Sequence, residues 1–437
     1  MAFPSGRFSP TRFRRAQAQR LLPFQCKAPL NCAAYRDDTQ ITVTWEKPNS
    51  EGQTINYYQV SYSSDGGTNW TVASSTISAS TFEYDITGLT NGTAYICSVQ
   101  AITWGVGERG LTGSVTPNGF FTYSVTGSPT ETTYMGTASG GVGYKYKVIY
   151  FTGTGTLTVS ANPGSSSASY GIVGGGGGGG KTTLGWSGYG GGGGGGGDII
   201  EGTIASGDIV DTWTATIGGG GTGGQSGANP TSGSQSSLSG ASHGSLTVMY
   251  GGGKALDGTT GSAPDWGNGS PSATNGGSGG GGGAKGWFGT GATNGNKGGE
   301  GMRNLSYGGA GGGGGGGAGG DAGNGYVYGS WGGSAYGGYG GAGYSTTLRL
   351  GTTETIAGGG GGGSCPNSSG GSSSNSSGQG GGGAGRGNGS SQSAIAGYYG
   401  YPGTANTGGG GGGAGIWGTD QYGGNGGSGR VVVRLPY

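Results

Sequence analysis

The clearest hydrophobic pattern lies in residues 28–118, where apolar and polar positions alternate in short segments. The stretch TQITVTWEKP places Ile41, Val43 and Trp45 on one side and stops at a proline. INYYQVSYSSDGG alternates again, and FEYDITGLTNGTAYICSVQAI contains two such segments around an Asn91-Gly92 turn. Short period-two strands separated by turn residues are typical of a β-sandwich. The alternation predicts that Tyr95, Cys97, Val99 and Ala101 point inward.

The second half of the chain mixes strand patterns with uninterrupted glycine. YKYKVIYFTGTGTLTVSAN, IIEGTIASGDIVDTWTATIG and the closing GGSGRVVVRLPY predict strands. Glycine makes up 124 of 437 residues, and its pure runs lie at 174–180, 190–197, 218–221, 279–283, 311–317, 358–363, 380–383 and 408–413. We expect a basic arm at 1–27, the sandwich at 28–118, a β-rich part at 119–217 leading into the glycine-rich body, and a glycine bundle with aromatic loops and a C-terminal strand at 218–437.

Pure glycine forms neither stable helices nor packed sandwich strands. It can form polyproline-II-type helices, and several of these side by side can exchange N–H···O=C bonds, because only glycine lets the backbones approach that closely. Ordering each glycine costs roughly 1–2 kcal/mol of backbone entropy, so a lattice of many runs is needed. Collagen is excluded, because the chain has no strict Gly-X-Y period and only 14 prolines. The predicted fold class is all-β, a sandwich followed by a β/polyglycine-II bundle.

Residues 28–118 resemble a fibronectin type III domain. The resemblance rests on Trp45, Tyr58, the Leu-x-x-Gly-x-x-Tyr spacing of Leu89, Gly92 and Tyr95, and the closing VTPNG. It implies that Trp45 sits in the core and that Tyr95 forms a corner, so both are structural. This fold hosts many functions, and the resemblance therefore predicts a spacer or a binding module.

The stretch YGIVGGGGGGGKTTLGW matches the phosphate-loop pattern through Gly175, Gly180, Lys181 and Thr182. A phosphate loop needs a helix after it, so that the helix N-terminus faces the phosphate. No helix can follow here, because the next residues are TTLGWSGYGGGGGGGGD. A glycine run that ends in Lys-Thr satisfies the pattern by chance, and we expect no nucleotide binding.

Residues 145–437 look like the glycine-rich domain of bacteriophage and other viral tail-fibre proteins. The resemblance is carried by the order of TGTGTLTVS, YGIVGGGGGGG, SGDIVDTWTATIGGGGTGG, STTLRLGTTETIAGGGGGG and GGSGRVVVRLPY. It implies a polyglycine-II bundle whose connecting loops meet the host surface. Two departures are the long Ser/Asn-rich loops and the preceding sandwich and arm. They leave open whether the chain is a distal adhesin or an appendage on a capsid or tail.

Charge is uneven along the chain. Residues 1–27 contain six basic side chains and no acid, residues 28–119 contain three basic and eight acidic ones, and the remainder holds eleven of each. The arm also carries four phenylalanines. We expect it to anchor the chain to other virion proteins through Arg12, Phe13, Arg14 and Arg15, with nucleic-acid contact, a solvated tail and a transit peptide as alternatives. A net charge of +1 argues against a general nucleic-acid binder.

The sequence offers little for catalysis or cofactor binding. His243 is the only histidine, and the four cysteines have no zinc spacing. The pairs Asp208/Asp211 and Asp257/Asp265 are interpreted as solvated turns. We expect no enzyme activity, no cofactor, no metal, no membrane insertion and no secretory signal, while a homo-oligomer and a disulfide of Cys26 or Cys32 are left open.

Aromatic side chains cluster between the glycine runs, and their flat faces suit sugar rings. The candidate ligand-binding residues are Trp331, Tyr336, Tyr339, Tyr326, Tyr328, Tyr399 and Trp417. The alternative is that they cap the lattice and shield its backbone. We expect a viral, phage-type fibre or appendage protein on the virion surface, which presents a host-attachment surface to a glycan or protein. The alternative is a structural capsid or tail decoration protein without receptor binding.

Overall fold

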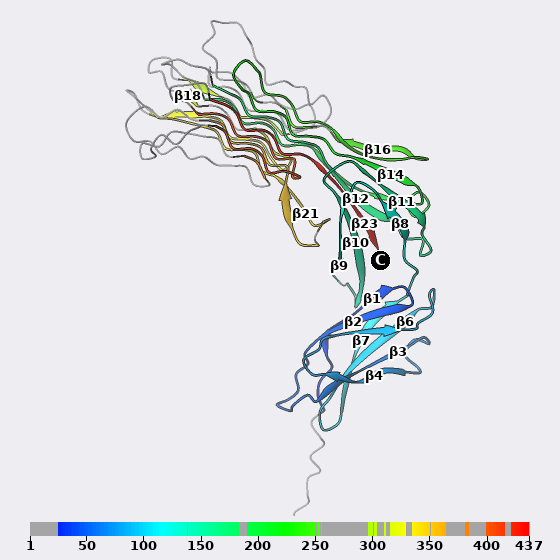
Figure 1. Ribbon diagram of the computed structural model, residues 1–437. Helices are drawn as coiled ribbons and strands as arrows, with labels where there is room; N and C mark the ends of the chain where they lie inside the picture. The colour runs from blue at the N-terminus through cyan, green and yellow to red at the C-terminus, as the bar shows by residue number, and fades with distance from the viewer. Residues whose placement is uncertain are drawn as a thin grey trace, which may run out of the picture. The chain divides into compact units, whose positions relative to one another are not determined.

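The computed structural model describes residues 25–137, 139–182, 190–249, 251–253, 255, 296–299, 301–303, 310–311, 315–328, 334–349, 351–363, 381–383, 399–415 and 421–436. These residues form strands and extended segments and contain no helix, which confirms the all-β fold class. Accordingly, they include no apolar helix of membrane-spanning length. They fall into two compact units, centred on residues 40–116 and 143–437 (Figure 1).

The first unit is a sandwich of two antiparallel sheets. One sheet has the order β1-β2-β5 and the other the order β4-β3-β6-β7. The strands are β1 (Leu30–Asp37), β2 (Gln40–Glu46), β3 (Tyr57–Ser63), β4 (Thr71–Ser78), β5 (Glu83–Thr87), β6 (Tyr95–Ile102) and β7 (Val106–Val115).

The core of this sandwich follows the alternation in the sequence. Trp45 is 3% exposed and packs edge-on against Tyr58, with 5.3 Å between the ring centroids. The inward positions expected on β6 are all buried. The Tyr95 hydroxyl accepts a hydrogen bond from the Thr90 backbone N–H at 3.2 Å, which fixes the corner before β6. Gly92 completes the preceding turn with a φ of +78°, a conformation that favours glycine.

Three cysteines lie inside this unit as free thiols. Cys26, Cys32 and Cys97 are buried and unpaired with one another. Burial raises the pKa of the Cys97 thiol to about 12, although its hydrogen bond with Thr112 lowers it, and raises that of Cys32 to about 11. Because a thiol in this state is rarely ionised, these side chains are inert packing groups.

The second unit contains another sandwich, built from two antiparallel sheets of orders β13-β12-β23-β10, with β9 added beside β10, and β16-β15-β14-β11-β8. The strands are β8 (Thr122–Val125), β9 (Thr130–Met135), β10 (Val142–Phe151), β11 (Gly155–Ala161), β12 (Ala168–Val173), β13 (Ile199–Ile204), β14 (Thr212–Thr216), β15 (Ser236–Gly240), β16 (Gly244–Met249) and β23 (Arg430–Pro436).

Strand β23 holds this sandwich together from the far end of the chain. It lies between β10 and β12, pairing Val433 with Ile149 on one side and with Tyr170 on the other (Figure 1). Val431, Val433 and Leu435 are fully buried in the core that the sheets enclose. The glycine-rich segments lie between β12 and β23 in the sequence, so they begin and end at strands of the same sandwich.

Those segments pack side by side as a lattice of extended runs. The 174–180 run shows the rule, because its amides donate in turn to three different neighbours. The amides of residues 174, 177 and 180 donate to the carbonyls of residues 198, 195 and 192. Those of residues 175 and 178 donate to residues 234 and 231, and those of residues 176 and 179 donate to residues 427 and 424. The same neighbour thus returns every third residue, as expected for a helix with three residues per turn.

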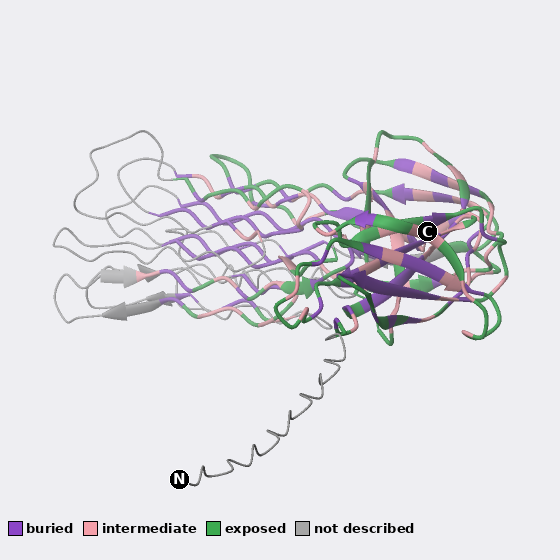
Figure 2. Ribbon diagram, turned by 90° about the horizontal axis from the view of Figure 1, so that it is seen from below, coloured by how far each residue is buried: buried purple, intermediate pink, exposed green. Residues whose placement is uncertain are grey.

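The carbonyls of the 174–180 run follow the same period on its other side. They accept from 252 and 255, from 221 and 224, and from 411 and 414. Six runs therefore surround this one. Three antiparallel runs accept hydrogen bonds from its amides, and three parallel runs donate hydrogen bonds to its carbonyls. In Figure 2 the central runs are buried along most of their length. This arrangement is the predicted polyglycine-II bundle.

Short hairpins join other runs of the bundle. They are β17 (Met302–Arg303) with β18 (Ala310–Gly311), β19 (Tyr326–Tyr328) with β20 (Ser334–Tyr336), and β21 (Tyr344–Thr346) with β22 (Glu354–Ile356). The lattice also includes the 174–180 and 190–197 runs, which precede the 218–437 range proposed from the sequence. The runs and the sandwich strands alternate along the chain.

Asp198 lies where the 190–197 run passes into β13. Burial raises the pKa of its carboxyl to about 6, although a hydrogen bond from the Ile199 N–H lowers it. The unfolded value is about 4, so between pH 4 and 6 the folded state binds more protons and stability falls as pH rises.

We expect Asp198→Asn to remove this pH-dependent loss of stability. The melting temperature of the variant minus that of the wild type should therefore rise from pH 4 to pH 7. Melting curves at one-unit pH steps measure it. A difference that stays constant across this range would contradict the assignment.

Candidate ligand-binding face

The stretch that resembles a phosphate loop is part of the lattice. Its amides bond to carbonyls of other runs, as when Gly180 N–H donates to Gly192 at 2.8 Å. The Lys181 ammonium is buried and donates to the Ala228 carbonyl at 3.1 Å and to Asn229 Oδ1 at 3.4 Å. The amides of residues 175–180 are thus engaged by other runs of the lattice.

The described tyrosines among the residues predicted to bind ligand lie on different parts of the bundle. Tyr326 and Tyr336 are register partners across β19 and β20, and Tyr328 pairs with Ser334. Tyr339 follows on the 337–343 run and is 49% exposed. Trp331, Trp417 and the anchoring residues Arg12, Phe13, Arg14 and Arg15 lie outside the described residues, and their roles stay predictions.

Tyr399 lies on another part of the bundle, against a residue that the prediction left out. Its ring stacks on that of Tyr422, with centroids 5.1 Å apart and planes inclined by 17°. The two residues come from neighbouring runs, which are joined where Gly400 N–H donates to the Tyr422 carbonyl at 2.9 Å. Tyr399 remains 46% exposed, so the stack offers an open aromatic surface.

Three runs form one outer layer around this stack, and we call it the three-run face: residues 218–225, 421–429 and 399–404. The 421–429 run is in the middle. Its amides at residues 423 and 426 donate to the carbonyls of residues 224 and 221 on the first run. Its carbonyls at residues 422 and 425 accept from the amides of residues 400 and 403 on the third run. The 174–180 and 408–415 runs lie beneath, because each bonds to two runs of the layer. The layer therefore has a supported inner side.

Side chains project from this layer at the period of the lattice. Exposed or half-exposed polar residues occur three apart, at Thr222 and Gln225 on one run and at Tyr422, Asn425 and Ser428 on the next. Three residues advance a polyproline-II-type run by about 9 Å. Sequence reasoning missed this set because it searched for aromatic clusters, while the signal is a polar residue at every third place in a glycine run.

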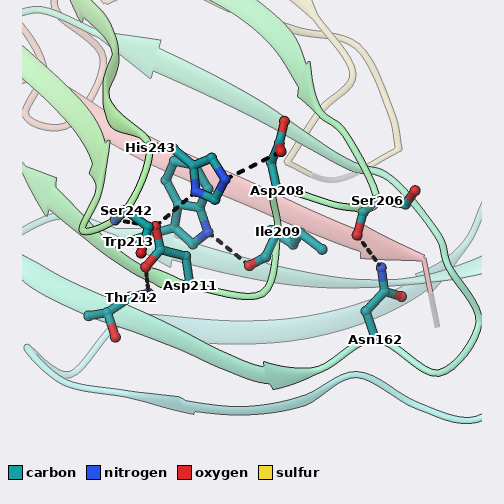
Figure 3. A network of polar contacts seen from close by, with 9 residues as sticks. All are labelled: Asn162, Ser206, Asp208, Ile209, Asp211, Thr212, Trp213, Ser242 and His243. Atoms are coloured by element: carbon teal, nitrogen blue, oxygen red, sulfur yellow. Dashed lines mark hydrogen bonds and ion pairs between the residues drawn. The ribbon is translucent and has the colours of Figure 1, made fainter.

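A separate polar network surrounds His243, on the turn between β15 and β16 (Figure 3). Its Nδ1 lies 3.0 Å from Asp211 Oδ2, its Nε2 lies 3.3 Å from Asp208 Oδ1, and its ring stacks on Trp213. The Asp211 side chain is only 5% exposed, which corrects the interpretation of this residue as part of a solvated turn.

Hydrogen bonds decide the charge state of Asp211. Burial acts to raise its pKa, but the Ser242 N–H, the His243 ring and the Thr212 N–H hold that pKa below its ordinary value. The carboxylate thus fastens two turns of the sandwich. Within the part of the chain that the structure describes, no group of three His, Cys, Asp or Glu side chains could hold a metal ion.

Comparisons with known proteins match this architecture. The model of the fibronectin type III domain matches residues 27–115, and the model of the glycine-rich domain matches residues 151–436, more than half of the chain. No curated protein matches it.

Two solved structures are also similar. The alpha chain of the chicken interferon gamma receptor has 11% identity, a TM-score of 0.20 and coverage of 41% of this chain and 76% of its own. The FN1–FN3 domains of chicken CNTN1 have 12% identity, a TM-score of 0.20 and coverage of 54% and 67%.

Proposed function

This chain belongs to the glycine-rich domain family, and on that premise we propose that it is a non-enzymatic attachment fibre of a virus particle, of the phage type. Together, a fibronectin type III domain and a glycine-rich domain fit a fibre-like or adhesin protein. Fibronectin type III domains are typically binding or scaffold domains. In the proposal, the N-terminal arm anchors the chain, the first sandwich is a spacer, and the bundle presents the surface that meets the host.

The observation that carries this proposal is the six-neighbour lattice. Its central runs use their amides and carbonyls on one another, so they keep a fixed shape without a large apolar core. Backbone alone cannot discriminate between ligands, and recognition is left to side chains at the outer runs and joining segments. Such segments can vary in sequence while the support stays rigid, as binding loops on a rigid scaffold do.

Immunogold electron microscopy tests the proposal on particles whose genome encodes this chain. We expect gold at the ends of fibres or appendages. We also expect deletion of residues 1–24, which spares the buried Cys26, to yield a folded chain that no longer enters the particle, because the arm is both basic and aromatic.

The other outcomes are equally informative. Gold spread over the capsid would favour the decoration protein, and particles without gold would overturn the virion assignment. Normal incorporation of the truncated chain would place the anchor outside residues 1–24.

A further inference from the structure

The three-run face is free of charge over its whole width. Residues 218–225, 399–404 and 421–429 contain no Asp, Glu, Lys or Arg. Side chains on the outer layer are hydroxyls, amides and tyrosine rings. A phosphate, an acidic polymer or a basic peptide would find no opposite charge here, so the face favours an uncharged ligand.

The stacked tyrosines give this face a rigid apolar platform. Tyr422 supports the ring of Tyr399, which stays 46% exposed although it is held in place. Because a tyrosine has only two side-chain torsions, it binds at low entropy cost. A pyranose ring has an apolar C–H face of similar size, bordered by hydroxyl groups that need hydrogen-bond partners.

Such partners stand on the neighbouring runs. Thr222 is exposed, and its hydroxyl lies 3.1 Å from that of Thr231. Asn425 is exposed, and its Oδ1 accepts from the Gly223 N–H at 2.8 Å, which orients the amide and leaves its NH₂ as a donor. Gln225 adds another exposed amide. Donors and acceptors thus lie beside the aromatic platform.

The spacing adds a further argument, since equivalent positions recur about every 9 Å along each run. A surface with a fixed repeat fits a polymer with a fixed repeat. We propose that the three-run face binds a neutral polysaccharide, with one sugar on Tyr399 and the next units along the Thr222–Asn425 side chains. The inference deepens the proposed attachment function and depends on it for its biological meaning.

Binding of the purified full chain to immobilised laminarin, mannan, dextran and galactan tests the inference, with alginate and heparin as charged polymers. We expect binding to at least one neutral polymer, unchanged between 50 and 500 mM salt because no charge takes part. Binding to none of the four, or to the charged polymers alone, would overturn it.

Variants locate the site. Tyr399→Ala with Tyr422→Ala should reduce binding at least tenfold, whereas Tyr399→Phe with Tyr422→Phe should keep it. Tyr344→Ala is the matched control, because Tyr344 is an exposed tyrosine, at 36%, on β21 outside the three-run face, and it should leave binding within twofold. Equal loss in the control, or full binding by the double alanine variant with an unchanged melting temperature, would rule out this face.

Failure here is separate from failure of the proposed function. A chain that lies on fibres by immunogold but binds no neutral polymer would remain an attachment protein whose ligand is of another class, such as a host protein. If the chain binds a neutral polymer but is absent from particles, the ligand site stands and the virion role is excluded.

Discussion

Alanine at position 194 will prevent the glycine bundle from folding normally. Gly194 lies in the 190–197 run, and a Cβ at this position would be 2.1 Å from the Gly177 carbonyl oxygen and 2.6 Å from its carbon. Real Cβ atoms do not approach backbone this closely, and backbone held by neighbours on every side cannot withdraw. We expect a lower melting temperature and rapid proteolysis, and a still larger effect from Gly194→Val.

Gly219→Ala is the matched control for this substitution. Gly219 lies on the three-run face, and a Cβ there would meet nothing within 4 Å. Replacing glycine by alanine at a compatible position stabilises a protein by about 0.4–1 kcal/mol, because the unfolded chain loses freedom. The two alanines should therefore act in opposite directions. Equal melting temperatures would mean that the 190–197 run is not packed as described.

Trp45→Ala will cost the first sandwich roughly 3–5 kcal/mol, the usual range for a buried aromatic side chain. Trp45 is 3% exposed and contacts Tyr58, which is itself fully buried, so truncation leaves a cavity between the sheets. Native-state hydrogen exchange at the β6 amides reports the free energy of unfolding of this unit within the full chain.

Trp104→Ala provides the comparison, since Trp104 is 93% exposed after the end of β6. Its removal should change the same free energy by less than about 0.5 kcal/mol, as for most surface substitutions. A loss below 1 kcal/mol for Trp45→Ala would place that side chain outside the core.

Sequence patterns predicted the first sandwich well because its signals are local. Alternation placed Tyr95 and Cys97 inside, and the Asn91-Gly92 turn lies where the sequence indicated. The second sandwich was predicted only as a β-rich part. Its β15 strand, SSLSG, buries Ser236 and Gly240 beside Leu238, so small residues take the places where large apolar ones would signal a strand.

Long-range pairing set the other limit on prediction. β23 was expected as a strand, but no local sequence pattern indicates that it pairs with β10 and β12. Likewise, Tyr399 was selected as a ligand-binding residue, whereas Tyr422, Asn425 and Thr222 were not, because their proximity depends on which glycine runs become neighbours. That choice is made by the whole lattice, and a single run carries no side chain to encode it.

The lattice also changes how the protein responds to temperature. Heat capacity rises on unfolding because apolar surface becomes hydrated, and exposed peptide groups act in the opposite direction. The 174–180, 190–197 and 408–413 runs are almost pure backbone, so their exposure adds peptide groups and hardly any hydrocarbon. The bundle therefore adds less heat capacity per residue than an ordinary domain. Its stability curve is flatter, and the bundle keeps its structure over a wider range of temperature.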